Sequence, residues 1–212
     1  MSDDARRARG SGLSLLLPTS WWTIDLTDPE SRSRAVRSLV EHSLGRADEA
    51  AQLRADLRTR LGRAADQAAA AGGVLMAVSL MKVGDLPVPA TGTVYRVPGL
   101  QLDAAGVESL TATLRESEAE ALDVAQAEDG TPVIRRVRLR PGDPELGAED
   151  IPQLVVDYWR TLGVAGPTVS MTFGSPMVQV REALLDLFDT IVSSASLVAE
   201  DDESAADTSV GS

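Results

Sequence analysis

The apolar residues of this chain change their spacing along the sequence, and this change constrains the fold more than any other feature. Residues 29–44 and 47–71 place apolar side chains three and four positions apart, as an amphipathic helix does. Residues 168–173 alternate strictly between apolar and polar side chains, which is typical of a strand with one buried face. A chain with both spacings is expected to pack helices on a sheet.

Pairs of residues mark the ends of the predicted helices. Asp28-Pro29 combines a helix N-cap with a proline at the first helical position. Gly72-Gly73 follows the second helix and precedes a strand, so we interpret it as a helix C-cap and not as a phosphate-binding loop. A middle helix is expected over residues 104–120 and a final helix after Ser175-Pro176.

The remaining apolar runs are expected to form strands, at residues 13–17, 21–26, 74–83, 91–97, 154–160 and 168–173. Tight turns join successive runs, which favours antiparallel pairing. The predicted fold class is α+β: a largely antiparallel sheet packed by an N-terminal helical pair, a middle helix and a C-terminal helix.

One hairpin can be assigned a register. Asp129-Gly130 is a strong signal for a two-residue turn. That turn places Asp123 opposite Arg136 and Val124 opposite Arg135. An acidic side chain that faces an arginine across the strands supports this register.

A chain of 212 residues is long enough for one sizeable core. We expect a single α+β domain over residues 12–198. A disordered charged segment at residues 1–11 is expected before it, and an acidic disordered tail at residues 199–212 after it.

Charge and composition exclude several classes of protein. The net charge of −12 disfavours binding to nucleic acid or to an anionic membrane. The absence of cysteine excludes thiol catalysis, cysteine-ligated zinc and disulfides, and it fits a reducing compartment. The apolar run at 13–17 is shorter than the roughly 7–15 residues of a signal-peptide core, and no run approaches the roughly 18 residues of a membrane span. We therefore expect a cytoplasmic protein.

No pattern in the sequence predicts a catalytic residue, a cofactor or a metal site. His42 is the single histidine, and Lys82, the single lysine, does not lie in a Walker-type loop. The acidic residues of the loop at 141–150 have enough oxygen atoms to bind calcium weakly, but they lack the spacing of an EF-hand. The prolines of that loop favour a solvated connection. Three acidic residues of the final helix are expected on its solvent face: Glu182, Asp186 and Asp189.

Two features suggest binding. Arg136, Arg138 and Arg140, here called the arginine stripe, share one face of a predicted strand and lie about 7 Å apart. These arginines either cover a neighbouring helix with acidic partners or form an exposed site for an acidic peptide or phosphate. Trp21 and Trp22 are adjacent in a strand and must point to opposite faces. Either both are covered by the helical pair, or one is exposed as a binding residue.

Two short segments carry a resemblance to a known fold. Residues 13–22 read as an apolar strand, a proline, small residues and tryptophan, and residues 169–191 read as a last strand and a closing helix. In these segments the chain resembles actinobacterial proteins of the PsbP-like α/β/α fold, which includes the DcrB family. The resemblance implies a non-enzymatic accessory, adaptor or chaperone-like role in binding other proteins, and it carries over no site residues.

The sequence therefore favours an intracellular module that binds another protein through the arginine stripe or the Trp21/Trp22 edge. Two alternatives stay open. One is a hydrolase-type enzyme with a site of carboxylates and hydroxyls, for which a pocket that joins an acidic residue to His42 would be the sign. The other is a structural subunit of a larger assembly, for which the sign would be a large exposed apolar patch.

Overall fold

The computed structural model describes residues 5–10, 12–45, 48–142, 144, 148–163 and 165–198. Within them the helices are α1 (Pro29–Leu44), α2 (Ala51–Ala70), α3 (Ala104–Arg115) and α4 (Arg181–Ser193), with short 3₁₀ turns at Asp48–Ala50 and Val178–Val180. The strands are β1 (Ala5–Gly10), β2 (Leu13–Pro18), β3 (Trp21–Asp25), β4 (Gly73–Ser79), β5 (Lys82–Val83), β6 (Leu86–Pro87), β7 (Thr91–Arg96), β8 (Ala121–Gln126), β9 (Pro132–Arg140), β10 (Gln153–Thr161), β11 (Thr168–Ser175) and β12 (Ser196–Leu197).

The strands form one large sheet and two small ones. Seven strands pair in the order β3-β4-β7-β11-β10-β9-β8, and every neighbouring pair is antiparallel. Strands β1, β2 and β12 form a separate sheet, and β5 pairs with β6 in a short hairpin. The α+β fold class and the antiparallel sheet predicted from the sequence are confirmed.

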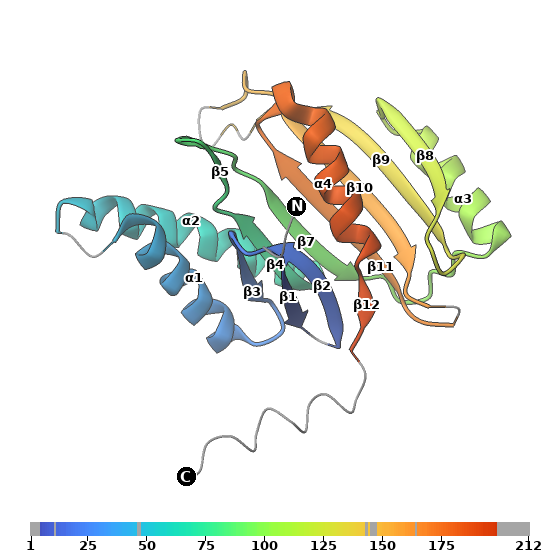
Figure 1. Ribbon diagram of the computed structural model, residues 1–212, viewed down its shortest axis with the longest axis horizontal. Coiled ribbons are helices and arrows are strands. Elements are labelled where there is room, and N and C mark those ends of the chain that lie inside the picture. Colours follow the sequence, from blue (N-terminus) through green and yellow to red (C-terminus); the bar gives the residue numbers. More distant parts are fainter. Residues whose placement is uncertain are drawn as a thin grey trace, which may run out of the picture.

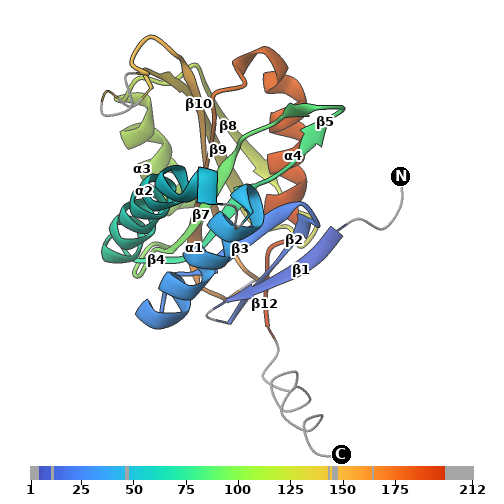
Figure 2. The same cartoon turned by 90° about the vertical axis from the view of Figure 1, so that its left-hand side faces the viewer.

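The large sheet lies between two layers (Figures 1 and 2). Helix α4 and the β1-β2-β12 sheet pack on one side, here called the covered face. Helices α1 and α2 pack over β3 and β4 on the other side, and α3 packs over β8 and β9 on that same side. The two helical groups therefore lie over opposite edges of one face of the sheet.

Aromatic side chains fill the centre of the covered face. Phe173 of β11 stacks on Phe188 of α4, with ring centroids 4.6 Å apart. Trp21 and Tyr158 contact the same Phe173 ring edge-on, at 6.4 and 5.9 Å. Leucines of β2 and α4 surround these rings and complete the main core.

The first half of α2 departs from the expected burial. The spacing of Leu53 and Leu57 predicts a buried stripe, but Leu53 is 57% exposed, and the buried residues of α2 are Ala65 and Ala68. Figure 1 shows the reason: the start of α2 extends past the edge of the sheet, and only its second half lies over β4. The small alanine side chains let that half approach the sheet closely.

The N-terminal residues correct one expectation. Residues 5–10, which the sequence places in a disordered segment, form β1 and pair with β2 along its whole length. Ala8 is buried in the main core, and the Arg6 guanidinium donates to the carbonyl oxygen of Trp21. The arginines of this segment are typical of disorder, which is why the sequence did not predict the strand. A charged residue can nevertheless lie in an edge strand, because its side chain stays in solvent while its backbone pairs. The predicted disordered tail at 199–212 lies outside the described residues.

The β8–β9 hairpin has a different register from the predicted one. Ala127 and Thr131 close a loop of three residues, in which the Gly130 amide donates to the Ala127 carbonyl and Gly130 has φ +78°. A turn of this kind, with glycine in the left-handed region at its last position, is the usual three-residue hairpin. The pairing therefore moves by one residue, so that Asp123 faces Arg135 and not Arg136.

Asp189 of α4 was predicted to lie on the solvent face of the helix, but its carboxylate turns toward the sheet. It accepts hydrogen bonds from the Tyr158 hydroxyl at 2.8 Å and from Arg135 Nη1 at 2.6 Å. Arg135 in turn donates to Asp123 of β8. This network joins α4 to three strands of the covered face. Burial, and then the bond to Asp189, raises the pKa of the Tyr158 phenol above its usual range.

We predict opposite effects of two glycine-to-alanine substitutions. A Cβ on Gly92 would lie 2.8 Å from the Phe173 ring, whereas a Cβ on Gly62, within α2, meets no atom within 4 Å. Gly92→Ala should lower the free energy of unfolding by about 1–3 kcal/mol. Gly62→Ala should raise it by up to about 1 kcal/mol, because alanine favours the helix. Urea denaturation measures both, and an unchanged value for Gly92→Ala would contradict the packing of Phe173.

We also predict a pH-dependent effect of Tyr158→Phe. The folded pKa of Tyr158 lies above that of an unfolded tyrosine, so its stabilising contribution is complete below pH ~10 and is lost as the pH rises above that value. At neutral pH the substitution should cost about 1 kcal/mol, the value of one hydrogen bond. The difference between wild type and variant should shrink in urea denaturation between pH 9 and 11. A constant difference would contradict the network.

Candidate binding face

Helices α2 and α3 lie at opposite ends of the sheet (Figure 1), and between them three strands carry side chains that, apart from Trp159, belong to neither apolar cluster under a helix. We call this surface the open face. The register places nine residues on it: Thr91, Thr93 and Tyr95 of β7, Ser170, Thr172 and Gly174 of β11, and Val155, Asp157 and Trp159 of β10. Of these, only Trp159 packs against the apolar cluster under a neighbouring helix.

The open face is polar but rich in aromatic rings for this chain. The chain has seven aromatic residues: three Trp, two Tyr and two Phe. Four of them fill the covered face, and the other three, Trp22, Tyr95 and Trp159, lie on the opposite face of the sheet and are half-buried. Half-buried tryptophan and tyrosine beside hydroxyl groups are typical of surfaces that bind other molecules.

Asp157 is the one buried acid of the open face, and two arginines of the stripe pair with it. Arg136 donates to Asp157 Oδ2 through Nε at 3.1 Å and Nη2 at 2.9 Å. Arg138 donates to the same oxygen through Nη2 at 2.5 Å. The other oxygen, Oδ1, accepts from the Thr172 hydroxyl at 2.9 Å. Asp157 therefore joins β9, β10 and β11 on the open face.

Trp159 and Ser117 hold Arg136 in place. Its guanidinium lies 5.4 Å from the centre of the Trp159 ring, which is the distance of a cation–π contact. Its Nη1 donates to the Ser117 hydroxyl just after α3. Arg136 thus connects the open face to the end of α3.

The arginine stripe divides into two parts. Arg136 and Arg138 are the members with acidic partners, as one of the two sequence hypotheses proposed, although the acid comes from β10 and not from a helix. Arg140 is exposed and has no partner among the described residues. The stripe therefore lies along the β9 side of the open face, with two largely buried arginines and, at its end, the exposed Arg140.

The two adjacent tryptophans lie on opposite faces of the sheet. Trp21 is 1% exposed and belongs to the main core. Trp22 is half-buried against α1, where its ring lies 5.4 Å from that of His42. Of the pair, only Trp22 lies on the same side of the sheet as the open face. His42 itself is exposed and does not line the cavity described next.

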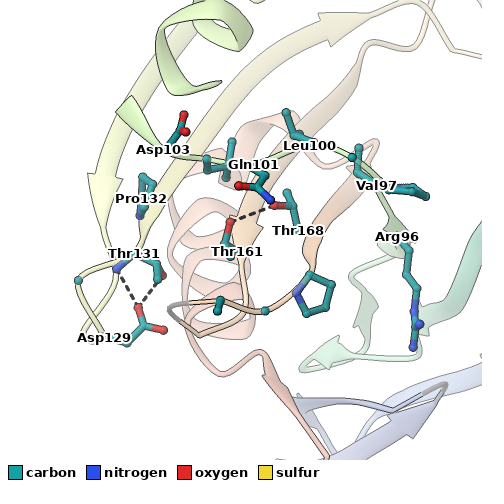
Figure 3. Close-up of a pocket in the computed structure, with 17 residues that line it drawn as sticks. Arg96, Val97, Leu100, Gln101, Asp103, Asp129, Thr131, Pro132, Thr161 and Thr168 are labelled. Atoms are coloured by element: carbon teal, nitrogen blue, oxygen red, sulfur yellow. Dashed lines mark hydrogen bonds between the residues drawn. The ribbon is translucent and has the colours of Figure 1, made fainter. Parts of the chain in front are cut away.

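A cavity of about 740 Å³ opens at one end of the open face (Figure 3). Loop residues after β7, the β8–β9 turn and the β10–β11 turn line it. Thr161 and Thr168, whose hydroxyls are 2.9 Å apart, lie at the point where the open face meets the cavity. At the rim, hydrogen bonds from the hydroxyl and then the amide of Thr131 lower the pKa of Asp129.

Other kinds of site find no support in the described residues. They contain no group of three or more histidine or acidic side chains that could hold a metal ion. Of the predicted acidic loop, Asp143 and Glu145 lie outside them. None of the helices they include is long and apolar enough to cross a membrane. No protein-family model matches the chain, and no curated protein matches it significantly.

Sequence reasoning missed three residues of this surface: Tyr95, Asp157 and Trp159. Asp157 interrupts the apolar run of residues 154–159, and a charge within an otherwise buried strand is the signal that could have located it. Tyr95 and Trp159 gave no comparable signal, because an aromatic residue in a strand is usually part of the core.

We predict that Asp157→Asn strongly destabilises the fold. The substitution leaves two arginines, with side chains 13% and 11% exposed, without a counter-charge. Removal of one partner from a buried ion pair costs about 3–5 kcal/mol. Asp123→Asn is the matched control, because Asp123 is 50% exposed and its pair with Arg135 should contribute at most about 1 kcal/mol. Equal changes in the free energy of unfolding would contradict the central role of Asp157.

Proposed function

We propose that this protein is a non-enzymatic accessory or adaptor module of the cytoplasm, and that it binds another protein through the open face. The observation that carries the proposal is the placement of the half-buried Tyr95 and Trp159 among the hydroxyl groups of the uncovered strands. Rigid strands hold these side chains, so a partner can bind them at a small cost in conformational entropy.

The surroundings of the open face support the same function. The surface continues past Thr161 and Thr168 into the cavity, so an extended partner segment can follow it from the arginine stripe to the loops. The resemblance to the PsbP-like and DcrB-like fold also favours a protein-binding role. The absence of cysteine is in keeping with a reducing cytoplasm.

Site-specific photo-crosslinking in the native cells tests the proposal. A photoreactive amino acid at Ser170, in the middle of the open face, should give a discrete product with a second protein, mapped to one segment of that protein. The same amino acid at Ser38, on the exposed side of α1, should give no such product. Both substitutions lie outside the core, so the free energy of unfolding should stay at the wild-type value.

Three results would contradict the proposal. The first is the absence of a product from Ser170, and the second is an equal product from both positions. The third is a product that contains only a second copy of this chain, because the function would then be self-assembly.

A further inference from the structure

We infer that the arginine stripe is built to bind a carboxylate of the partner, so that the segment seated on the open face carries an aspartate or glutamate side chain there. The inference rests on the proposed function and names the chemistry of one contact. Three observations support it: the charge balance of the stripe, the free donors of Arg138, and the acids beside α3.

The charges around Asp157 do not balance. Arg136 and Arg138 carry two positive charges, and Asp157 is the only acid with which either forms an ion pair in the described part of the chain. All three side chains are largely buried, with 13%, 11% and 6% of their surface exposed. An uncompensated charge is costly in such surroundings, so one further negative charge stabilises the cluster.

The hydrogen bonds identify Arg138 as the residue with spare donors. Arg136 uses all three of its nitrogens, two toward Asp157 and one toward Ser117. Arg138 uses only Nη2, and its Nε and Nη1 have no partner among the described residues. Its Nε is fully buried, so Nη1 is the donor that a ligand can reach. Arg140 lies two residues further along β9 on the same face, and it adds an exposed guanidinium next to Arg138.

Two considerations favour a carboxylate over a phosphate. The excess at the buried cluster is a single positive charge, which a carboxylate matches and a doubly charged phosphate exceeds. Glu116 and Glu118, both exposed, flank Ser117 at the same end of α3 and repel an anion of higher charge. Glu120 is engaged by Arg181 and is not available to the stripe.

Nuclear magnetic resonance of the full-length protein tests the inference. The probes are the peptide N-acetyl-Gly-Glu-Gly-amide, the same peptide with glutamine, and inorganic phosphate, all at constant ionic strength. The glutamate peptide should shift the indole signal of Trp159, on which Arg136 stacks, and leave that of the buried Trp21 in place. The glutamine peptide should shift neither signal.

Substitutions then show which arginines bind the glutamate of the peptide. Arg138→Gln should lower the association constant of the glutamate peptide about ten-fold, which is typical of a charge-assisted hydrogen bond. Arg140→Gln removes an exposed arginine that has no hydrogen bond or ion pair with another described residue, and it should lower the constant about two- to three-fold even if Arg138→Gln perturbs the fold. Arg115→Gln, which removes the same charge from the exposed side of α3, is the control and should have almost no effect.

The inference is overturned if both peptides shift Trp159 equally, if the Arg115 variant matches the Arg140 variant, or if phosphate binds more tightly than the glutamate peptide. Its failure is distinguishable from that of the proposed function. If Ser170 still crosslinks to a partner while the glutamate peptide has no effect, only the carboxylate contact is wrong. If the peptide binds through the stripe but no crosslinked partner exists, the proposed protein-binding function is wrong.

Discussion

The packing of four aromatic rings on the covered face is the interaction on which the rest of the structure depends. Phe173 contacts Phe188, Trp21 and Tyr158, and these residues come from β11, α4, β3 and β10. In a chain with only 3% aromatic residues, four of the seven aromatic side chains meet in this one cluster at the centre of the core. It fixes α4 on one side of the sheet, and strand alternation then decides which residues must face the other side.

On the opposite face, apolar clusters lie under α1, α2 and α3, but charged groups join the strands between the two helical groups. Asp157 connects three strands there through Arg136, Arg138 and Thr172. Replacement of such a cluster by apolar residues is often neutral or stabilising, so its presence here is not explained by stability alone. A polar face kept accessible between two helical groups fits a surface for binding, which is why we assign the function there.

Much of the architecture could be predicted from the sequence because it depends on local signals. The carboxylate of the N-cap residue Asp28 accepts a hydrogen bond from the Ser31 amide, and α1 ends at Leu44 before Gly45, which has positive φ, as the spacing and end residues indicate. The site could be predicted only in part. The arginine stripe was located, but its acidic partner, Asp157, is about twenty residues distant in the chain. Pairing across three strands has no local signature, and the hairpin register depended on whether Gly130 closed a two- or a three-residue loop.

The sequence by itself determined the four helices, the strands of the large sheet and their antiparallel pairing, and that Trp21 and Trp22 must point to opposite faces of the sheet. These properties follow from backbone propensity and from the periods of the two structures. The tertiary structure alone decided that β1 completes a second sheet, that α2 extends past the sheet edge, and that Tyr95, Asp157 and Trp159 meet on one open face. The physical reason is that strand order and helix placement bring together residues that are remote in the chain, and only their packing decides which face is covered.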